Sequence, residues 1–262
     1  MRSRPTIALL TDFGLSDPYV GSMKGVISAI APGTPILDLS HEVLPQNITQ
    51  AGYLLWSCYK YFPAGTIFVC VVDPGVGSGR RVLCVDGAGY RFLGPDNGLL
   101  QLVLDSLDGY SIVIVENRRY FRNEISPTFH GRDIFAPVAA HLSRGVRSAS
   151  LGRRTTSSVP GERLVRISTQ GKKRYQGIII HIDRFGNVIS NFQAGGGLRS
   201  NLSLHVGARA VHRSFHTYSE AGEKTPFMVV GSSGLIEIAV KNGNAARSLH
   251  ARIGQSITLK SS

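Results

Sequence analysis

The chain lacks any long apolar run. Among its 262 residues no stretch approaches the roughly 20 apolar residues that a membrane-spanning helix needs. The apolar run near the start, Ile7–Leu10, is also too short for the core of a signal peptide. We therefore expect a soluble, cytoplasmic protein that does not enter a membrane.

Cysteine is scarce as well. The three cysteines, Cys58, Cys70 and Cys84, include no C-x-x-C pair, and no histidine lies near them at the spacing of metal ligands. Cys70 and Cys84 fall inside strand-like runs, which favours buried, reduced thiols over a redox or metal role. The sequence therefore predicts no structural zinc site.

Acidic residues are outnumbered by basic ones. The chain has 17 Asp and Glu against 29 Lys and Arg, a formal net charge of +12 at pH 7. Such a charge permits attraction to nucleic acid. The basic residues, however, are scattered in short groups such as Arg118-Arg119 and Lys172–Arg174, without interleaved aromatic residues. A basic, nucleic-acid-associated protein is therefore kept only as an alternative.

The first half of the chain has an α/β pattern. Short apolar runs alternate with amphipathic helical segments from Ile7 to about Arg147, which predicts a mostly parallel sheet flanked by helices. The predicted strands are Ile7–Leu10, Pro35–Leu39, Thr66–Val72, Ile112–Val115 and a hairpin of Arg81–Val85 and Tyr90–Leu93 around Asp86-Gly87. The predicted helices begin at Asp17, as N-cap before Pro18, at Asn47, near Leu99 and near Asp133.

The second half of the chain has a different residue pattern. The polar stretch Arg153–Gly161 is predicted to be a linker, and short strands punctuated by Gly, Asn and Ser follow it without a long helix. These strands are Gly177–Ile182, Val188–Phe192, Ser203–Val206, Phe227–Val230, Leu235–Val240 and Ser256–Leu259. We expect a smaller all-β, barrel-like domain, and we assign residues 1–155 to the α/β domain, 156–172 to the linker and 173–262 to the β domain.

Polar motifs stand where the predicted strands end. They are Thr11–Gly14, Asp73–Arg80, Gly94–Gly98 and, at the start of the last helix, Thr128–Asp133. Because open α/β sheets bind ligands beyond the carboxyl ends of their strands, the four motifs predict one cleft for a nucleoside-like ligand. The glycine loop within Asp73–Arg80 has neither Walker nor dinucleotide-binding spacing. A phosphate cradle and a tight connection between strands are equal alternatives for it.

Four side chains in these motifs are candidates for chemistry. Asp12 suits a ribose diol, although an aspartate that only caps its loop is an equal alternative. Asp73, Arg80 and His130 offer a base, a cationic hydrogen-bond donor and a titrating imidazole. Their spacing in the sequence does not show whether they meet in space.

The chain resembles the S-adenosyl-L-methionine (SAM) hydroxide adenosyltransferase family, which is related to the fluorinases and chlorinases. The resemblance covers nearly the whole chain, and its carriers are Leu10–Gly14, Asp73–Gly77, Gly94–Gly98, Phe129–Asp133, Ile182–Asn187 and Gly231–Gly234. It implies hydrolysis of SAM to adenosine and L-methionine by attack of water at C5′. It also implies a homotrimer with sites at subunit interfaces, without metal or cofactor. A protein that holds SAM or adenosine without turning it over is the rival interpretation.

The resemblance also implies roles for individual residues. Asp73 with His130 would orient and deprotonate the water, and Arg80 would stabilise the developing hydroxide. The implied substrate contacts are Asp12 to the ribose, Asp183 and Asn187 to the methionine amino group and the adenine edge, Phe129 and Phe185 as aromatic neighbours, Ser232 to the methionine carboxylate, and Asn244 with Ala245 to the adenine.

Asp73 distinguishes the water-using from the halide-using enzymes that the chain resembles. The halide-using relatives carry a tyrosine where this chain has Asp73. A carboxylate repels a halide ion and accepts a hydrogen bond from water, so the water-using branch is favoured. One departure concerns the residues that would contact the methionine carboxylate. The halogenating relatives have an arginine after the serine that matches Ser232, and this chain has Ser233 there.

Overall fold

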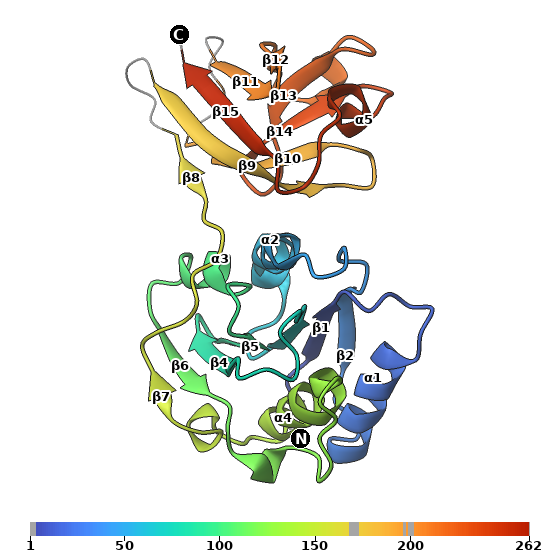
Figure 1. The fold of residues 1–262 in the computed structure, drawn as a ribbon, viewed down its shortest axis with the longest axis vertical. Helices are drawn as coiled ribbons and strands as arrows, with labels where there is room; N and C mark the ends of the chain where they lie inside the picture. The colour runs from blue at the N-terminus through green and yellow to red at the C-terminus, as the bar shows by residue number, and fades with distance from the viewer. Residues whose placement is uncertain (1–3, 168–172, 196–197, 199–201, 262) are drawn as a thin grey trace. The chain divides into compact units, whose positions relative to one another are not determined.

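The structure is a computed structural model that describes residues 4–167, 173–195, 198 and 202–261 (Figure 1). The chain divides into two compact units, Met1–Glu162 and Arg163–Ser262. The division falls inside the segment 156–172 that we assigned to a linker. In the part of the chain that the structure describes, no helix has the length and apolarity needed to cross a membrane.

The first unit is built on a seven-stranded mixed sheet in the order β2-β1-β3-β5-β4-β6-β7. Its strands are β1 (Ile7–Thr11), β2 (Ile36–Ser40), β3 (Ile67–Val71), β4 (Val82–Gly87), β5 (Tyr90–Pro95), β6 (Tyr110–Ile114) and β7 (Arg154–Thr155). Strands β2, β1, β3 and β5 pair in parallel, whereas β4, β6 and β7 join antiparallel. β1 and β3 are buried along their whole length, as continuous apolar runs predict for central parallel strands.

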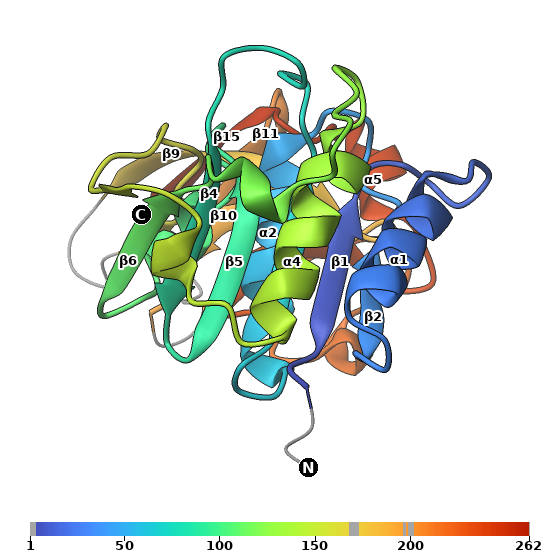
Figure 2. The same cartoon turned by 90° about the horizontal axis from the view of Figure 1, so that it is seen from below.

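Helices cover both faces of this sheet. They are α1 (Tyr19–Ile30), α2 (Ile48–Cys58), α3 (Gln101–Leu104) and α4 (Ala136–Ser143), with short helices η1 (Tyr59–Tyr61), η2 (Arg118–Tyr120), η3 (Gly131–Phe135) and η4 (Ser148–Ser150). One core contains Met23 of α1 and Val138 of α4, and the other contains Leu55 of α2 and Val103 of α3. Figure 2 shows α1 and α4 side by side on one face, with α2 behind the sheet. The α/β architecture predicted for this half is confirmed.

Several predicted boundaries were wrong. The hairpin turns at Ala88-Gly89, where φ is 50° and 80°, and not at Asp86-Gly87, which ends β4. Two consecutive positive φ angles define the type I′ turn that matches the twist of paired strands. The first helix starts at Tyr19 with Pro18 as its N-cap, so Asp17 provides no cap. Asn47 does cap α2, accepting a bond of 2.9 Å from the backbone N–H of Gln50.

The second unit is a nearly closed β-barrel with the strand order β12-β11-β15-β9-β10-β14-β13, and β8 pairs with β10. The strands are β8 (Val165–Arg166), β9 (Arg174–Ile182), β10 (Val188–Gln193), β11 (Leu202–Val206), β12 (Arg209–Val211), β13 (Pro226–Val230), β14 (Leu235–Val240) and β15 (Ser256–Ser261), with short helices η5 (Tyr218–Glu220) and α5 (Ala245–Leu249). Alternating residues of these strands, such as Ile236 and Ile238, fill its core. The predicted barrel-like domain is confirmed, although β8 and β12 were missed.

The cysteines behave as buried thiols. All three are free, and Cys70 and Cys84 are fully buried in β3 and β4. Burial raises the pKa of the Cys84 thiol to about 12 and that of Cys58 to about 11. Thiolates are therefore scarce at neutral pH, and the predicted reduced, unreactive state follows from their position in the sheet.

Candidate active site

A cavity of about 620 Å³ opens in the first unit beyond the carboxyl ends of β1 and β3. Small-molecule pockets typically have roughly 300–1,000 Å³, so the cavity suits a nucleoside-sized ligand. Asp12 follows β1 directly, and Asp73 lies two residues after β3. Because β1 and β3 are parallel neighbours, both carboxylates reach the same end of the sheet. The cavity is lined by Asp12, Phe13, Tyr19, Pro45, Gln46, Val71, Asp73, Pro74, Val76, Ser126, Thr128, Phe129, His130, Gly131 and Arg132.

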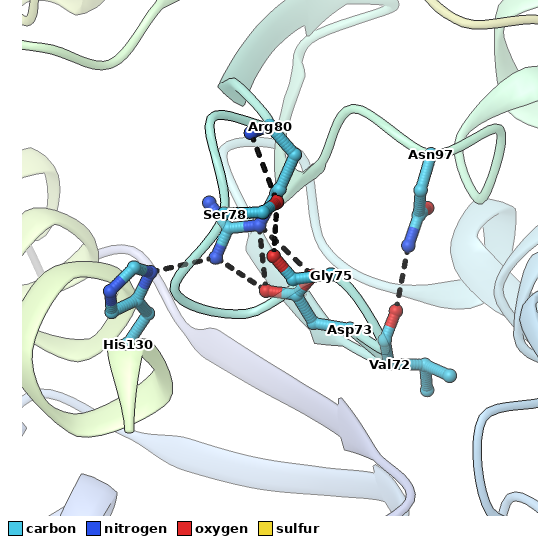
Figure 3. Close-up of polar contacts among 7 residues, drawn as sticks. All are labelled: Val72, Asp73, Gly75, Ser78, Arg80, Asn97 and His130. Carbon is cyan, nitrogen blue, oxygen red and sulfur yellow. Dashed lines mark hydrogen bonds and ion pairs between the residues drawn. The ribbon is translucent and has the colours of Figure 1, made fainter. Parts of the chain in front are cut away.

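Asp73, Arg80 and His130 meet at one wall of this cavity (Figure 3). Arg80 donates from Nε to both carboxylate oxygens of Asp73, at 2.9 and 2.8 Å, and from Nη2 to Oδ2. The same Nη2 lies 2.8 Å from Nδ1 of His130. The side chains of Asp73 and Arg80 are 5% and 10% exposed. Asp73 and His130 face the cavity, whereas Arg80 is not among its lining residues and links the two from behind.

The contact between Arg80 and His130 defines the state of the imidazole. A guanidinium has only donors, so Nδ1 of His130 must accept, and the ring proton is assigned to Nε2. Burial lowers the pKa of His130, and the positive charge of Arg80 lowers it further, although the charges of Asp73 and Asp133 oppose this. At neutral pH, His130 is therefore an uncharged ring whose Nε2–H points away from Arg80 (Figure 3).

The glycine loop between β3 and β4 is a tight connection. Backbone bonds from Val76 to Asp73 and from Ser78 to Gly75 close it on itself. Gly77 has φ of 79°, and a Cβ atom there would lie 2.5 Å from the carbonyl oxygen of Pro127. These glycines therefore serve the fold of the loop, which brings Arg80 back over Asp73. Asn97 fixes the next loop by donating from Nδ2 to the carbonyl of Val72 at 2.9 Å (Figure 3).

Aromatic rings and Asp12 form another part of the cavity. Phe129 stands edge-on to Phe13 and Tyr19, with ring centroids 5.9 and 5.2 Å away. Asp12 accepts a bond of 2.8 Å at Oδ2 from the backbone N–H of Gln46, so its Oδ1 has no protein donor among the described residues. Tyr19 was missed in the sequence, because a tyrosine at the start of a helix carries no distinctive signal. The wall combines apolar faces with one carboxylate, as a nucleoside requires.

A π-helical turn positions His130. The last predicted helix begins at Gly131, two residues before Asp133, as the π-helix η3 (Gly131–Phe135), and then continues as α4. Such turns are common at functional sites because they realign the residues beside them. The side chain of Asp133 is fully buried and accepts from Arg132 at 2.7 and 2.9 Å, from Arg122 at 3.0 Å and from the backbone N–H of Ser126 at 2.9 Å. This network ties the segment before His130 to the helix after it.

We expect Asp133→Asn to destabilise the fold by roughly 2–4 kcal/mol, because the buried site loses charge-assisted acceptors for two arginines. Burial tends to raise the pKa of Asp133, but hydrogen bonds from Arg132, Ser126 and Arg122 outweigh it and the pKa is lowered. The stabilisation is therefore present above the ordinary Asp value and is lost as pH falls through the lowered one. Thermal unfolding from pH 7 to 3 measures both effects. Glu116→Gln, at an exposed ion pair with Arg153, is the control and should lower the free energy of unfolding by less than about 1 kcal/mol. An equal loss of stability in both variants would contradict the prediction.

The second unit gathers the other predicted binding residues at one end of its barrel. Oδ1 of Asp183 accepts from the backbone N–H groups of Phe185 and Asn187 at 2.9 and 2.8 Å, and Oδ2 accepts from Nδ2 of Asn187 at 2.9 Å. The Phe185 side chain is 76% exposed. Gly186 lies against the side chain of Asn244, which caps α5 by accepting from Arg247. Asp183, Phe185, Asn187 and Asn244 thus lie in two adjoining segments.

The remaining predicted residues lie near this group. Ala245 is buried behind Asn244, and Ser232 is exposed in the turn between β13 and β14. Glu237, which sequence reasoning missed, is buried against Gly231 and accepts from the Tyr218 hydroxyl at 3.2 Å. Burial raises the pKa of Glu237, and the charge of Asp183 adds to this. Its position inside the strand pattern gave no signal of a role. Among the described residues, no group of three or more His, Cys, Asp or Glu could hold a metal ion.

Two family models match most of the chain. The model of the SAM hydroxide adenosyltransferase N-terminal domain matches residues 7–152, and that of the SAM hydroxide adenosyltransferase C-terminal domain matches residues 177–258. The first match contains Asp12, Asp73, Arg80 and His130. The second contains the predicted binding residues of the barrel.

Individual proteins give the same result. The chain is 36% identical to the (R)-S-adenosyl-L-methionine hydrolase of Thermus thermophilus over 97% of this chain and 98% of that protein. It is 26% identical to a fluorinase of an Actinoplanes species, over 97% of each chain. A crystal structure of an uncharacterized conserved protein from Thermotoga maritima superposes with a TM-score of 0.85 at 32% identity, covering 97% of this chain and 99% of that one.

Proposed function

Because the chain belongs to the SAM hydroxide adenosyltransferase family, we propose that it hydrolyses S-adenosyl-L-methionine to adenosine and L-methionine. The observation that carries this proposal is the hydrogen-bonded set of Asp73, Arg80 and His130 at the wall of a nucleoside-sized cavity. The curated hydrolases of Thermus thermophilus and other organisms support it at 33–36% identity.

The reaction needs a positioned oxygen more than it needs an acid. A lone pair of water forms the C5′–O bond while the C5′–S bond breaks and its electron pair goes to sulfur. Methionine leaves as a neutral thioether, and the former water passes one proton to the Asp73 carboxylate, from which it reaches solvent, to yield the 5′-hydroxyl of adenosine. The barrier therefore depends on placing water in line with C5′ and sulfur, which is a matter of proximity and orientation.

The geometry supports a role for each member of the set. Asp73 accepts a hydrogen bond from the attacking water and its negative charge stabilises the positive charge that grows on that oxygen. Nε2–H of His130 donates to the same water, which leaves one lone pair for C5′. The Arg80 guanidinium directs all its described hydrogen bonds to Asp73 and His130. We therefore assign Arg80 a positioning role in place of direct stabilisation of a hydroxide.

Asp73 also disfavours a halide as nucleophile. A halide ion in its place would face a carboxylate that is only 5% exposed, and like charges repel strongly where water is scarce. The family includes fluorinases among its relatives. The proposal thus places this chain on the water-using side of that division.

Three finer statements belong to the same proposal. The relatives' names specify the (R) epimer at sulfur, so we propose that this chain prefers (R)-SAM. Because candidate substrate residues occur in both units, we propose a homotrimer in which neighbouring subunits complete one another's sites. Three free thiols suit a reducing compartment, and we place the protein in the cytoplasm. Separate assays of the two SAM epimers test the preference for (R)-SAM, and the molar mass in solution tests the homotrimer.

Incubation of the pure protein with SAM in ¹⁸O-labelled water tests the reaction itself. We expect ¹⁸O at the 5′-hydroxyl of adenosine, seen as a mass increase of the nucleoside, together with an equal amount of methionine. Chloride and fluoride should give no 5′-halogenated product. Binding of SAM without release of adenosine would reject the proposal in favour of a binding protein.

The pH dependence should follow His130. Because its pKa lies below the ordinary histidine value, the acidic decline of kcat should have its midpoint below about pH 6.5, and kcat should be nearly constant around pH 8. Protonation at Nδ1 would remove the acceptor that Arg80 needs. A kcat–pH profile measures this, with His130→Gln as the control that has no imidazole to titrate. A wild-type decline with its midpoint above pH 6.5 would contradict the assignment.

A further inference from the structure

A second cavity of about 220 Å³ lies in the first unit, apart from the active site. Its lining residues are Asp86, Arg91, Ser111, Val113, Arg147, Ser148, Ala149 and Arg154. Arg91 is the second residue of β5, which runs parallel to β3. The active-site cavity lies beyond the carboxyl end of β3, so the second cavity lies toward the opposite end of the sheet.

Strand register gathers the polar side chains of this cavity on one face. Asp86 stands opposite Arg91 on β5 and opposite Ser111 on β6, and Arg154 of β7 stands opposite Val113. Residues directly opposite one another in antiparallel strands project from the same face of a sheet. The segment containing Arg147 and η4 completes the wall.

The cavity carries unbalanced positive charge. Arg91 forms an ion pair with Asp86, with Nε 3.1 Å from Oδ1. Arg147 and Arg154 are exposed, and neither side chain has an ion pair or hydrogen bond with another described residue. Three guanidinium groups against one carboxylate leave two positive charges without a counter-ion.

We propose that this cavity binds the phosphate group of a phosphate monoester. Two unopposed positive charges match the dianion, and arginine forks present paired donors to its oxygens. The volume is below the roughly 300 Å³ of typical small-molecule pockets, so the cavity holds the phosphate group with room for only a small part of the molecule that carries it. A phosphodiester carries one charge, and this distinguishes the proposed ligand from a nucleic-acid backbone.

Inorganic phosphate and phenyl phosphate are the probes, with diethyl phosphate and sodium chloride at matched ionic strength as the comparison solutes. Both probes should raise the melting temperature and bind with measurable heat, and diethyl phosphate should do neither. The double substitution Arg147→Ala with Arg154→Ala should weaken binding of phosphate by about tenfold or more. Arg118→Ala, at an exposed arginine of η2 outside the cavity, should change it less than about twofold.

The proposal is overturned if phosphate does not bind, if binding survives the double substitution, or if the diester binds as tightly as the monoester. None of these outcomes depends on turnover of SAM.

Discussion

Asp73→Asn should lower kcat by about 10²–10⁴-fold while KM stays within about threefold. Asparagine has nearly the same shape, but it carries no charge and presents a donor where the carboxylate has only acceptors. The water then loses both an acceptor and the negative charge that opposes the positive charge on its oxygen. Single-turnover measurement of adenosine release, alongside a binding titration with SAM, separates the chemical step from binding.

Loss of stability is the effect that must be separated from this result. Asp73→Asn leaves Arg80, 10% exposed, without its counter-ion, and breaking a buried pair costs roughly 3–5 kcal/mol. Asp96→Asn is the matched control, because Asp96 is 2% exposed, pairs with Arg81 at 2.6 Å and does not line the cavity. Both variants should unfold at lower temperature, but only Asp73→Asn should lose turnover. A parallel loss of kcat in both would assign the effect to folding.

Arg80→Met should reduce kcat by about 10²-fold or more and shift the acidic limb of the pH profile to higher pH. Burial and the positive charge of Arg80 are the two main causes that lower the pKa of His130. When the guanidinium is removed, the negative charge of Asp73 still raises this pKa, so the pKa of His130 should increase. A larger share of His130 is then protonated at neutral pH, and Asp73 loses the fork that fixes its orientation. A profile of kcat against pH, recorded beside the wild type, measures both the loss of kcat and the pH at which its acidic decline occurs.

Arg80→Lys is the matched comparison for this prediction. Lysine keeps the positive charge, so the acidic limb should stay close to that of the wild type. A single ammonium cannot reproduce the planar fork that reaches both Asp73 and His130, so kcat should recover only in part. If Arg80→Met lowers kcat and leaves the limb in place, Arg80 supports the fold of the loop without tuning His130.

Much of the fold could be predicted from local patterns. Continuous apolar runs identified β1 and β3, alternation identified the barrel strands, and Asn47 marked the start of α2, because each depends on side chains near in sequence. Errors occurred where the backbone conformation of one or two residues decides the outcome. The Ala88-Gly89 turn and the π-helical start at Gly131 depend on φ angles and on packing against distant segments, which composition does not report.

By itself, the sequence determined the α/β and β-barrel classes, the family, and the placement of Asp12, Asp73 and His130 at strand or helix ends. Only the tertiary structure decided that Arg80 lies behind the cavity wall and bonds a histidine 50 residues away. It also decided that arginines from β5, β7 and the segment before η4 share one pocket. The physical reason is that periodicity reports which face of an element is buried. The partner of a charged side chain is set instead by how loops and strands distant in sequence close around it.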